Sequence, residues 1–129
     1  MKARLSDWLW VGLGGATGTL ARGGIAEFFS FSSFPTGTLI VNLVGSLLLG
    51  GFTAYLFFRK NNTLHLLFGV GFCGSFTTMS MFAADATILL STSAFQFLAY
   101  VLASVIGGIL LAMLGFWIIK NIYERGQAA

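Results

Sequence analysis

The sequence predicts an all-α integral membrane protein with four membrane-spanning helices. Of its 129 residues, 57% are hydrophobic and only 9% are charged, which lies outside the usual range of soluble domains. A helix needs about 20 mostly apolar residues to cross a bilayer, so four spans would use nearly the whole chain. We expect one membrane domain over residues 1–129, with spans at about 8–28, 37–58, 64–90 and 95–119.

The first expected span is rich in glycine and carries one internal charge. Trp8 and Trp10 stand where aromatic rings settle at a membrane interface. We do not interpret the segment as a signal peptide, because the apolar run continues without a clear cleavage site. Arg22 either snorkels to the headgroups or pairs with Glu27, or it places a positive charge in an aqueous vestibule. Close helix packing is expected at the glycines 12, 14, 15, 18, 23 and 24.

The second expected span follows a connector, residues 29–36, that contains the only proline and is predicted to turn at the interface. It opens with GTLIVNLVGS and places Asn42 about two turns inside. A side-chain amide at that depth requires hydrogen-bond partners. It either links neighbouring helices or is presented to a passing solute. His65, after the polar loop that ends this span, is given no role.

The third expected span contains the most unusual stretch of the chain, GFCGSFTTMSMFAAD at residues 71–85. Two glycines, two threonines, two serines and an aspartate stand here inside an otherwise apolar region. Polar side chains are costly in hydrocarbon, and glycines followed by paired threonines favour a break that frees backbone groups. Such breaks persist only where protein buries them or where they line a water path. The stretch therefore predicts a helix broken near its middle that serves as a pore or binding element.

The fourth expected span follows a short uncharged link, about residues 91–94. Tyr100, Ser104 and Gly108 recur every four residues, so they share one face of this helix. This face is small and polar, which is typical of a helix contact surface.

The basic residues predict a single orientation in the membrane. With four spans, both termini and the central loop share one side, and that side carries six basic residues against at most Arg22 on the other. The positive-inside rule places this side in the cytoplasm. The six residues are Lys2, Arg4, Arg59, Lys60, Lys120 and Arg125.

Sequence signatures of enzymes are absent. There is one histidine, the acids are scattered, and no HExxH, GxSxG or GxxxxGK motif occurs. The single cysteine, Cys73, excludes an intramolecular disulfide and a cysteine metal cluster. Two alternatives to a pore stay open: a proton-coupled small-solute transporter that uses Asp85, its only deep acid, and a non-conducting assembly protein. The transporter is disfavoured because a transporter of this kind is expected to carry a carboxylate within its first span, and this chain has none deep in that span.

The deep polar groups are mostly hydrogen-bond donors, which favour an anion. The electropositive edge of the Phe82 ring adds to them without a fixed charge. A narrow, donor-lined and largely uncharged path replaces the water that a small anion loses, yet does not hold the ion too tightly. The residues alone thus indicate a pore for an anion or small polar solute. The donors are the Asn42 amide, the hydroxyls of Thr77, Thr78, Ser80 and Ser104, and the Tyr100 phenol.

Three runs, GTLIVNLVGS at 37–46, GFCGSFTTMSMFAAD at 71–85 and AYVLASVIGG at 99–108, resemble the Fluc/CrcB family of fluoride channels, and the resemblance covers essentially the whole chain. It implies an antiparallel dimer of four-span subunits that exports fluoride passively through two pores lined by both chains. It also implies a structural sodium ion (Na+) at the dimer centre. Backbone carbonyls of Gly74 and Thr77 are the implied sodium ligands.

The resemblance also implies roles for side chains. Asn42 looks like the pore asparagine, Phe82 like the second phenylalanine of an aromatic box, and Arg22 like a vestibule arginine. Ser80, Tyr100 and Ser104 match polar positions along the fluoride path of the family. We assign Thr78 to the same path. Asp85 stands where the family commonly has a glutamate.

Two methionines depart from the family pattern, which commonly reads TTFSTF where this chain reads TTMSMF. Met79 replaces a box phenylalanine and Met81 replaces a pore threonine, and a thioether donates no hydrogen bond. One explanation is drift at packing positions. The other joins the change to the fixed orientation: some members of the family form homodimers, while others pair two subunits of opposite orientation. We therefore expect a heterodimer with a homologous subunit, with one conducting pore, rather than a homodimer.

Overall fold

A computed structural model describes residues 4–32 and 34–127 of the chain, and every regular element in these ranges is a helix. The all-α fold class is therefore confirmed. The first two helices are α1 (Leu5–Phe28) and α2 (Thr36–Arg59). A composite helix follows, and the chain ends in α6 (Ala94–Gln127). The composite helix consists of α3 (Asn62–Leu64), the π-helix η1 (His65–Cys73), α4 (Gly74–Phe76) and α5 (Met79–Thr92).

Three segments within the described ranges are long and apolar enough to cross a membrane. They are Thr36–Arg59, Asn62–Thr92 and Ala94–Gly126. The protein is thus a multi-pass membrane protein. The first helix, α1, has 24 residues but is not among the three.

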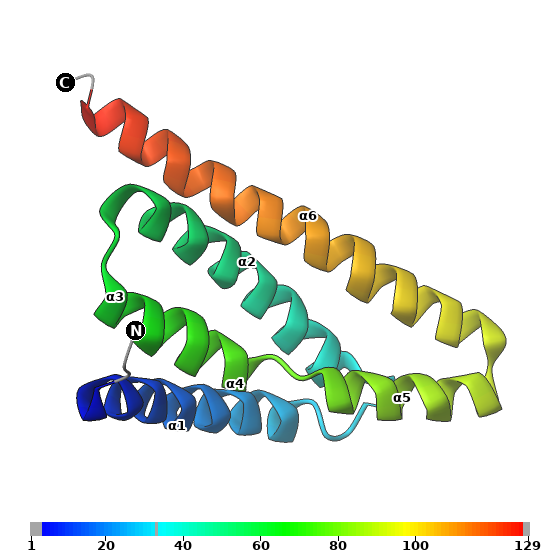
Figure 1. The fold of residues 1–129 in the computed structure, drawn as a ribbon. Helices are drawn as coiled ribbons and strands as arrows, with labels where there is room; N and C mark the ends of the chain where they lie inside the picture. The colour runs from blue at the N-terminus through cyan, green and yellow to red at the C-terminus, as the bar shows by residue number, and fades with distance from the viewer. Residues whose placement is uncertain (1–3, 33, 128–129) are drawn as a thin grey trace.

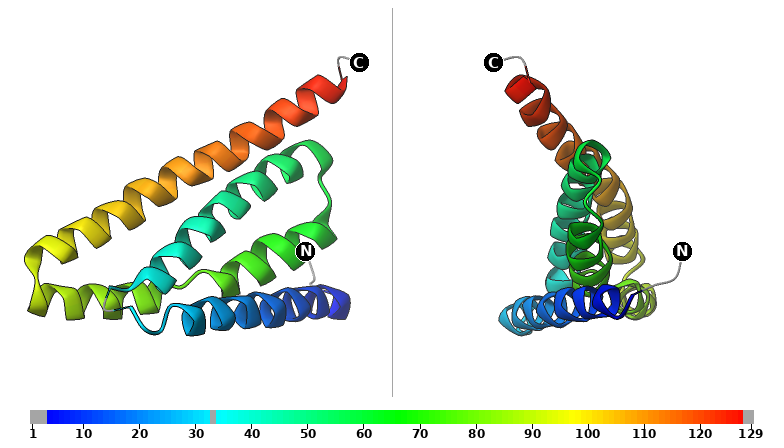
Figure 2. Two further views of the ribbon diagram at one scale, coloured as in Figure 1. Left: turned by 180° about the vertical axis from the view of Figure 1, so that it is seen from behind. Right: turned by 60° about the vertical axis from the view of Figure 1, so that its left-hand side comes forward.

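The helices pair along their lengths. Figure 1 shows α1 beside the segment formed by α3, η1 and α4, and it shows α2 beside α6. Figure 2 shows the same pairs from behind. Both ends of the described chain and the α2–α3 loop lie toward the left of Figure 1, while the loops that follow α1 and α5 lie away from them.

Glycines bring the paired backbones into contact. A Cβ atom at Gly14 would overlap the Leu67 carbonyl of η1, and a Cβ atom at Gly115 of α6 would overlap the Leu47 carbonyl of α2. The sequence predicted close helix packing at the glycines of the first helix, and this prediction is only partly right. Gly12, Gly23 and Gly24 have no neighbour within 4 Å of the position that a Cβ would take, because they lie on the faces of α1 that no described helix covers.

The most completely buried large side chain is Tyr100 of α6, with 0% of its surface exposed. Val41 of α2 and Cys73 of η1 are each 1% exposed. The core of the chain therefore lies where α2, α6 and the composite helix meet.

Candidate functional site

The composite helix is interrupted at Thr77 and Thr78. Helix α4 ends at Phe76 and α5 begins at Met79. Thr77 has a ψ angle of 156° and Thr78 has φ and ψ angles of −146° and 114°, so both residues are extended. Figure 1 shows the interruption as the non-helical link between α4 and α5. Backbone groups on either side of such a link lose their regular helical partners.

The side chain of Asn42 fills part of this gap from α2. Its Oδ1 accepts a hydrogen bond from the Thr78 amide at 2.8 Å, and its Nδ2 donates to the Thr78 carbonyl at 3.1 Å. Both backbone groups of one extended residue are thus satisfied by one side chain. The sequence left two roles open for Asn42, a link between neighbouring helices or a side chain presented to a solute. The structure shows the link directly.

The two threonines satisfy further backbone groups at the interruption. The Thr78 hydroxyl accepts from the Met81 amide at 3.2 Å, which caps the first turn of α5. It also lies 3.2 Å from the Ser80 hydroxyl. The Thr77 hydroxyl donates to the Cys73 carbonyl at 2.8 Å.

The carbonyls of Gly74 and Thr77 are two of those that lose, at the interruption, the donors that a continuous helix would give them. The Thr78 amide would bond to the Gly74 carbonyl, but it donates to Asn42. The Met81 amide would bond to the Thr77 carbonyl, but it donates to the Thr78 hydroxyl. Hard cations such as sodium take oxygen ligands. The carbonyls of Gly74 and Thr77, which the resemblance implies as sodium ligands, therefore fit a sodium ion in their chemistry.

A groove of about 300 Å³ lies against the interruption. None of the described residues that line it is charged. The Ser104 hydroxyl is buried and has no hydrogen-bond partner among the described residues. The lining thus includes an unpaired donor in neutral surroundings, and the oxygen of that donor is buried in the described chain. Its lining residues are Asn42, Gly45, Ser46 and Leu49 of α2, Thr77, Thr78, Met79 and Phe82 of the composite helix, and Ser104 and Val105 of α6.

Phe82 connects this groove to a part-buried polar pair. Its ring stacks on that of Tyr100, with ring centroids 5.3 Å apart and an interplanar angle of 28°. The Tyr100 hydroxyl donates to Oδ2 of Asp85 at 3.3 Å. One ring of the stack thus lines the groove, and the other ends in a hydrogen bond to the deepest acid.

A family model described as CrcB-like protein, Camphor Resistance (CrcB), matches residues 9–116. The chain belongs to the CrcB family. This confirms the resemblance drawn from the three sequence runs.

Named relatives within the family are similar over most of their length. A protein of Halalkalibacterium halodurans named Fluoride-specific ion channel FluC 2 is 41% identical over 126 residues, which covers 97% of this chain and 94% of the relative. A protein of the same name in Bacillus subtilis is 39% identical, with 85% of each chain covered. Fluoride-specific ion channel FluC 1 of Desulfitobacterium hafniense is 43% identical over 76% of this chain and 89% of its own.

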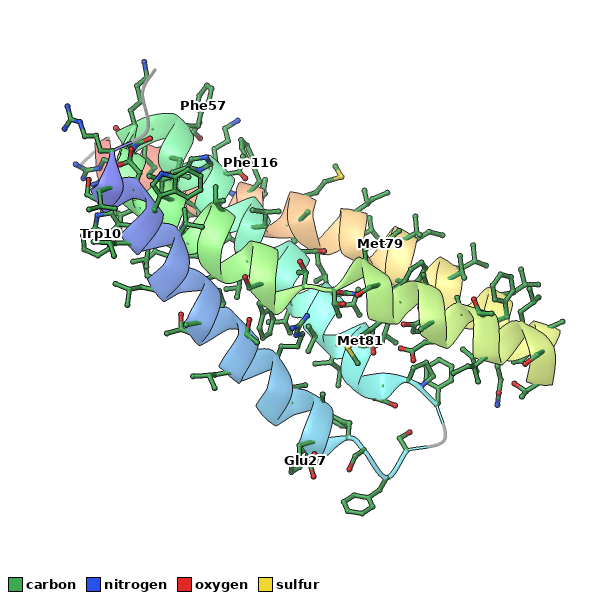
Figure 3. The ribbon with its side chains drawn as sticks, turned by 60° about the horizontal axis from the view of Figure 1, so that its bottom comes forward. Trp10, Glu27, Phe57, Met79, Met81 and Phe116 are labelled. Carbon is green, nitrogen blue, oxygen red and sulfur yellow. The ribbon has the colours of Figure 1, made fainter. Side chains whose placement is uncertain are left out.

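The two methionines that depart from the CrcB pattern differ in their surroundings. Met79 lines the groove and is 75% exposed, so the groove is open on that side. Met81 is 40% exposed and is not among the lining residues. Figure 3 shows both at the start of α5, where the interrupted helix resumes.

Ser80 and Arg22 lie outside the groove lining. Ser80 is exposed and reaches the groove only through its hydrogen bond with Thr78. Arg22 is half-buried on α1. The one ion pair within residues 4–32 and 34–127 joins Lys120 to Glu124, so the pairing of Arg22 with Glu27 that the sequence left open is not present. Figure 3 shows Glu27 at the end of α1, away from the interruption.

Four groove residues were not singled out from the sequence: Gly45, Ser46, Leu49 and Val105. The first three follow Asn42 by three, four and seven positions, which places them on one helical face with it. This spacing could have identified them. A Cβ atom at Gly45 would overlap the Thr77 methyl group, so glycine is required for α2 to approach the interruption this closely.

Proposed function

We propose that this chain is a subunit of a fluoride-selective ion channel that exports fluoride passively from the cytoplasm. Its main support is the uncharged groove beside the helix interruption, which holds the unpartnered Ser104 hydroxyl. The names of the relatives support fluoride as the ion, since each is called a fluoride-specific ion channel.

The groove has the chemistry that a small anion requires. The Asn42 amide carries a second N–H besides the one donated to Thr78, and Ser104 offers a hydroxyl. The Phe82 ring can present its electropositive edge. Donors replace the lost hydration shell, and the absence of charged residues in the described lining keeps the ion from being held too strongly for conduction. Ser80, Thr78 and Tyr100 extend the proposed path toward Asp85, and Arg22 is the proposed vestibule charge.

We also propose a structural sodium ion at the interruption, held by the backbone carbonyls of Gly74 and Thr77. The donors of both carbonyls are diverted, to Asn42 and to Thr78, which supports this assignment. A bound sodium would supply a fixed positive charge beside the groove.

A second subunit is needed to complete the path. The groove is open at Met79, and a path for a dehydrated ion needs a wall on every side. We propose that an inverted subunit closes it in an antiparallel dimer. We also propose that α1 crosses the membrane as a fourth span, so that both termini lie in the cytoplasm with the six basic residues.

A heterodimer fits these features better than a homodimer. A chain of fixed orientation does not meet an inverted copy of itself, and the numbered names FluC 1 and FluC 2 among the relatives support more than one kind of subunit. Met79 places a thioether where the family pattern has a ring, which would weaken one pore and spare the other.

Fluoride efflux from liposomes tests the function. The purified chain is reconstituted alone and with an inverted homologous subunit, and fluoride release is followed with an electrode in the absence of a proton gradient. We expect downhill release that is strong with the partner and survives Asp85→Asn. Release that needs a proton gradient and is lost in Asp85→Asn would indicate a proton-coupled transporter instead. Full release from the chain alone would contradict the heterodimer.

A further inference from the structure

The loop between α1 and α2 holds one aromatic residue in a fixed place. The Phe34 amide donates to the Ser32 hydroxyl at 3.3 Å. The Phe34 carbonyl accepts from the Thr36 amide at 2.7 Å and from the Thr36 hydroxyl at 3.2 Å. The Ser32 and Thr36 hydroxyls also lie 3.1 Å apart. Hydrogen bonds on both sides of Phe34 thus restrain its backbone.

This ring contacts Tyr100. The centroids of the Phe34 and Tyr100 rings are 5.8 Å apart and their planes meet at 86°, an edge-to-face contact. Phe82 stacks on the same tyrosine ring. Tyr100 is therefore held by two rings from different elements, one in the loop and one in α5.

The same loop reaches the hydrogen-bond partner of Tyr100. A hollow of about 180 Å³ is lined by Ser32 and Pro35 of the loop together with Asp85, Ile88 and Leu89 of α5. Loop residues thus contact Tyr100 and flank Asp85, the two partners of a part-buried hydrogen bond. Phe34 is not among the residues that line the groove, and a chain of ring contacts connects it to the groove through Tyr100 and Phe82.

We propose that Phe34 is a positioning residue for the Tyr100 hydroxyl on the ion path, an inference that rests on the proposed function. A phenol has a single O–H donor, and its direction follows from the orientation of the ring. Phe82 supports that ring by stacking, and Phe34 restrains it edge-on. When the Phe34 ring is removed, the tyrosine ring gains freedom to turn, and its hydroxyl leaves the position between Asp85 and the path.

The test compares Phe34→Leu with Phe34→Tyr, which keeps the ring, and with Phe31→Leu, which changes a residue of the same loop that is 97% exposed. Each protein is labelled with 3-fluorotyrosine, and the Tyr100 signal in the ¹⁹F NMR spectrum is assigned with Tyr100→Phe. Fluoride efflux is measured on the same preparations, with the homologous subunit present.

We expect Phe34→Leu to shift the Tyr100 signal and to lower fluoride efflux by about threefold to tenfold, the range that the loss of one aromatic contact gives. Phe34→Tyr should restore both quantities, and Phe31→Leu should change neither. If the wild-type protein carries fluoride and Phe34→Leu carries it at the same rate, the positioning role is overturned and the proposed function stands. A loss of efflux that Phe34→Tyr does not rescue would also overturn it. If the wild-type protein carries no fluoride, the proposed function fails and the inference fails with it.

Discussion

Asn42 and Thr78 are joined by two hydrogen bonds of opposite direction, although 36 positions separate them in the sequence. The Asn42 side-chain amide makes the hydrogen bonds that a neighbouring backbone segment would otherwise make. It satisfies both the N–H and the C=O of the extended Thr78. Because it occupies the Thr78 amide, it also leaves the Gly74 carbonyl without its helical donor. One side chain thus stabilises the interruption and exposes a potential cation ligand there.

Gly45→Ala should destabilise the protein by about 1–3 kcal/mol, because the added methyl group overlaps the Thr77 side chain and lies 3.3 Å from the Phe76 ring. Thermal unfolding in detergent measures the change. Gly12→Ala is the matched control, since nothing lies within 4 Å of its Cβ position. It should leave stability unchanged or raise it by up to about 1 kcal/mol. Equal effects of the two changes would show that α2 does not approach the interruption as described.

Thr78→Val should cost about 0.5–2 kcal/mol, because the methyl group that replaces the hydroxyl cannot accept from the Met81 amide at the start of α5. Thr78→Ser keeps the hydroxyl and should retain most of the stability. Both are measured by circular dichroism during thermal unfolding. If valine and serine behave alike, the cap does not stabilise α5.

Met79→Phe should raise fluoride efflux by up to about twofold when the chain is reconstituted with the homologous subunit, because a ring edge replaces a thioether at the groove of the weakened pore. Met113→Phe, on an exposed position of α6, is the control and should have no effect. A rise in both variants would point to a general effect of added phenylalanine. No rise in either would mean that Met79 does not limit the path.

Removal of sodium should abolish most of the fluoride efflux, since the Gly74 and Thr77 carbonyls are expected to hold the ion. Purification and efflux are carried out with potassium in place of sodium throughout, and sodium is then returned to half of the sample. Recovery on return is the expected result. Equal efflux in the two salts would show that the channel does not require a bound sodium ion.

Composition was enough to predict the helical membrane fold and to mark the third apolar region as unusual, since paired threonines, serines and an acid close together are costly inside a span. The π-helical form of η1, from His65 to Cys73, was not foreseen. Its apolar sequence suits an α-helix equally well, so residue type alone does not distinguish the two. Helix α6 also extends to Gln127, past the expected end near residue 119, because no glycine or proline stops it at the interface.

The site was predicted as a set of residue types rather than as contacts. The need of Asn42 for partners followed from burying an amide, but its partner Thr78 depends on how α2 crosses the interruption. Tyr100 was expected on a polar helix face and proves to be fully buried between two phenylalanine rings. Phe34 gave no signal in the sequence, because a phenylalanine in a loop at an interface is ordinary.

The most direct test of the fluoride path is efflux from liposomes that contain wild-type protein, Asn42→Asp or the control Asn62→Asp, each with the homologous subunit present and no proton gradient applied. Aspartate at position 42 cannot donate to the Thr78 carbonyl, and it adds negative charge to the groove. We expect a loss of about tenfold or more. Asn62 is exposed at the first turn of α3, so Asn62→Asp should match the wild type. Wild-type efflux from Asn42→Asp would contradict the account, because it would mean that fluoride does not pass the interruption.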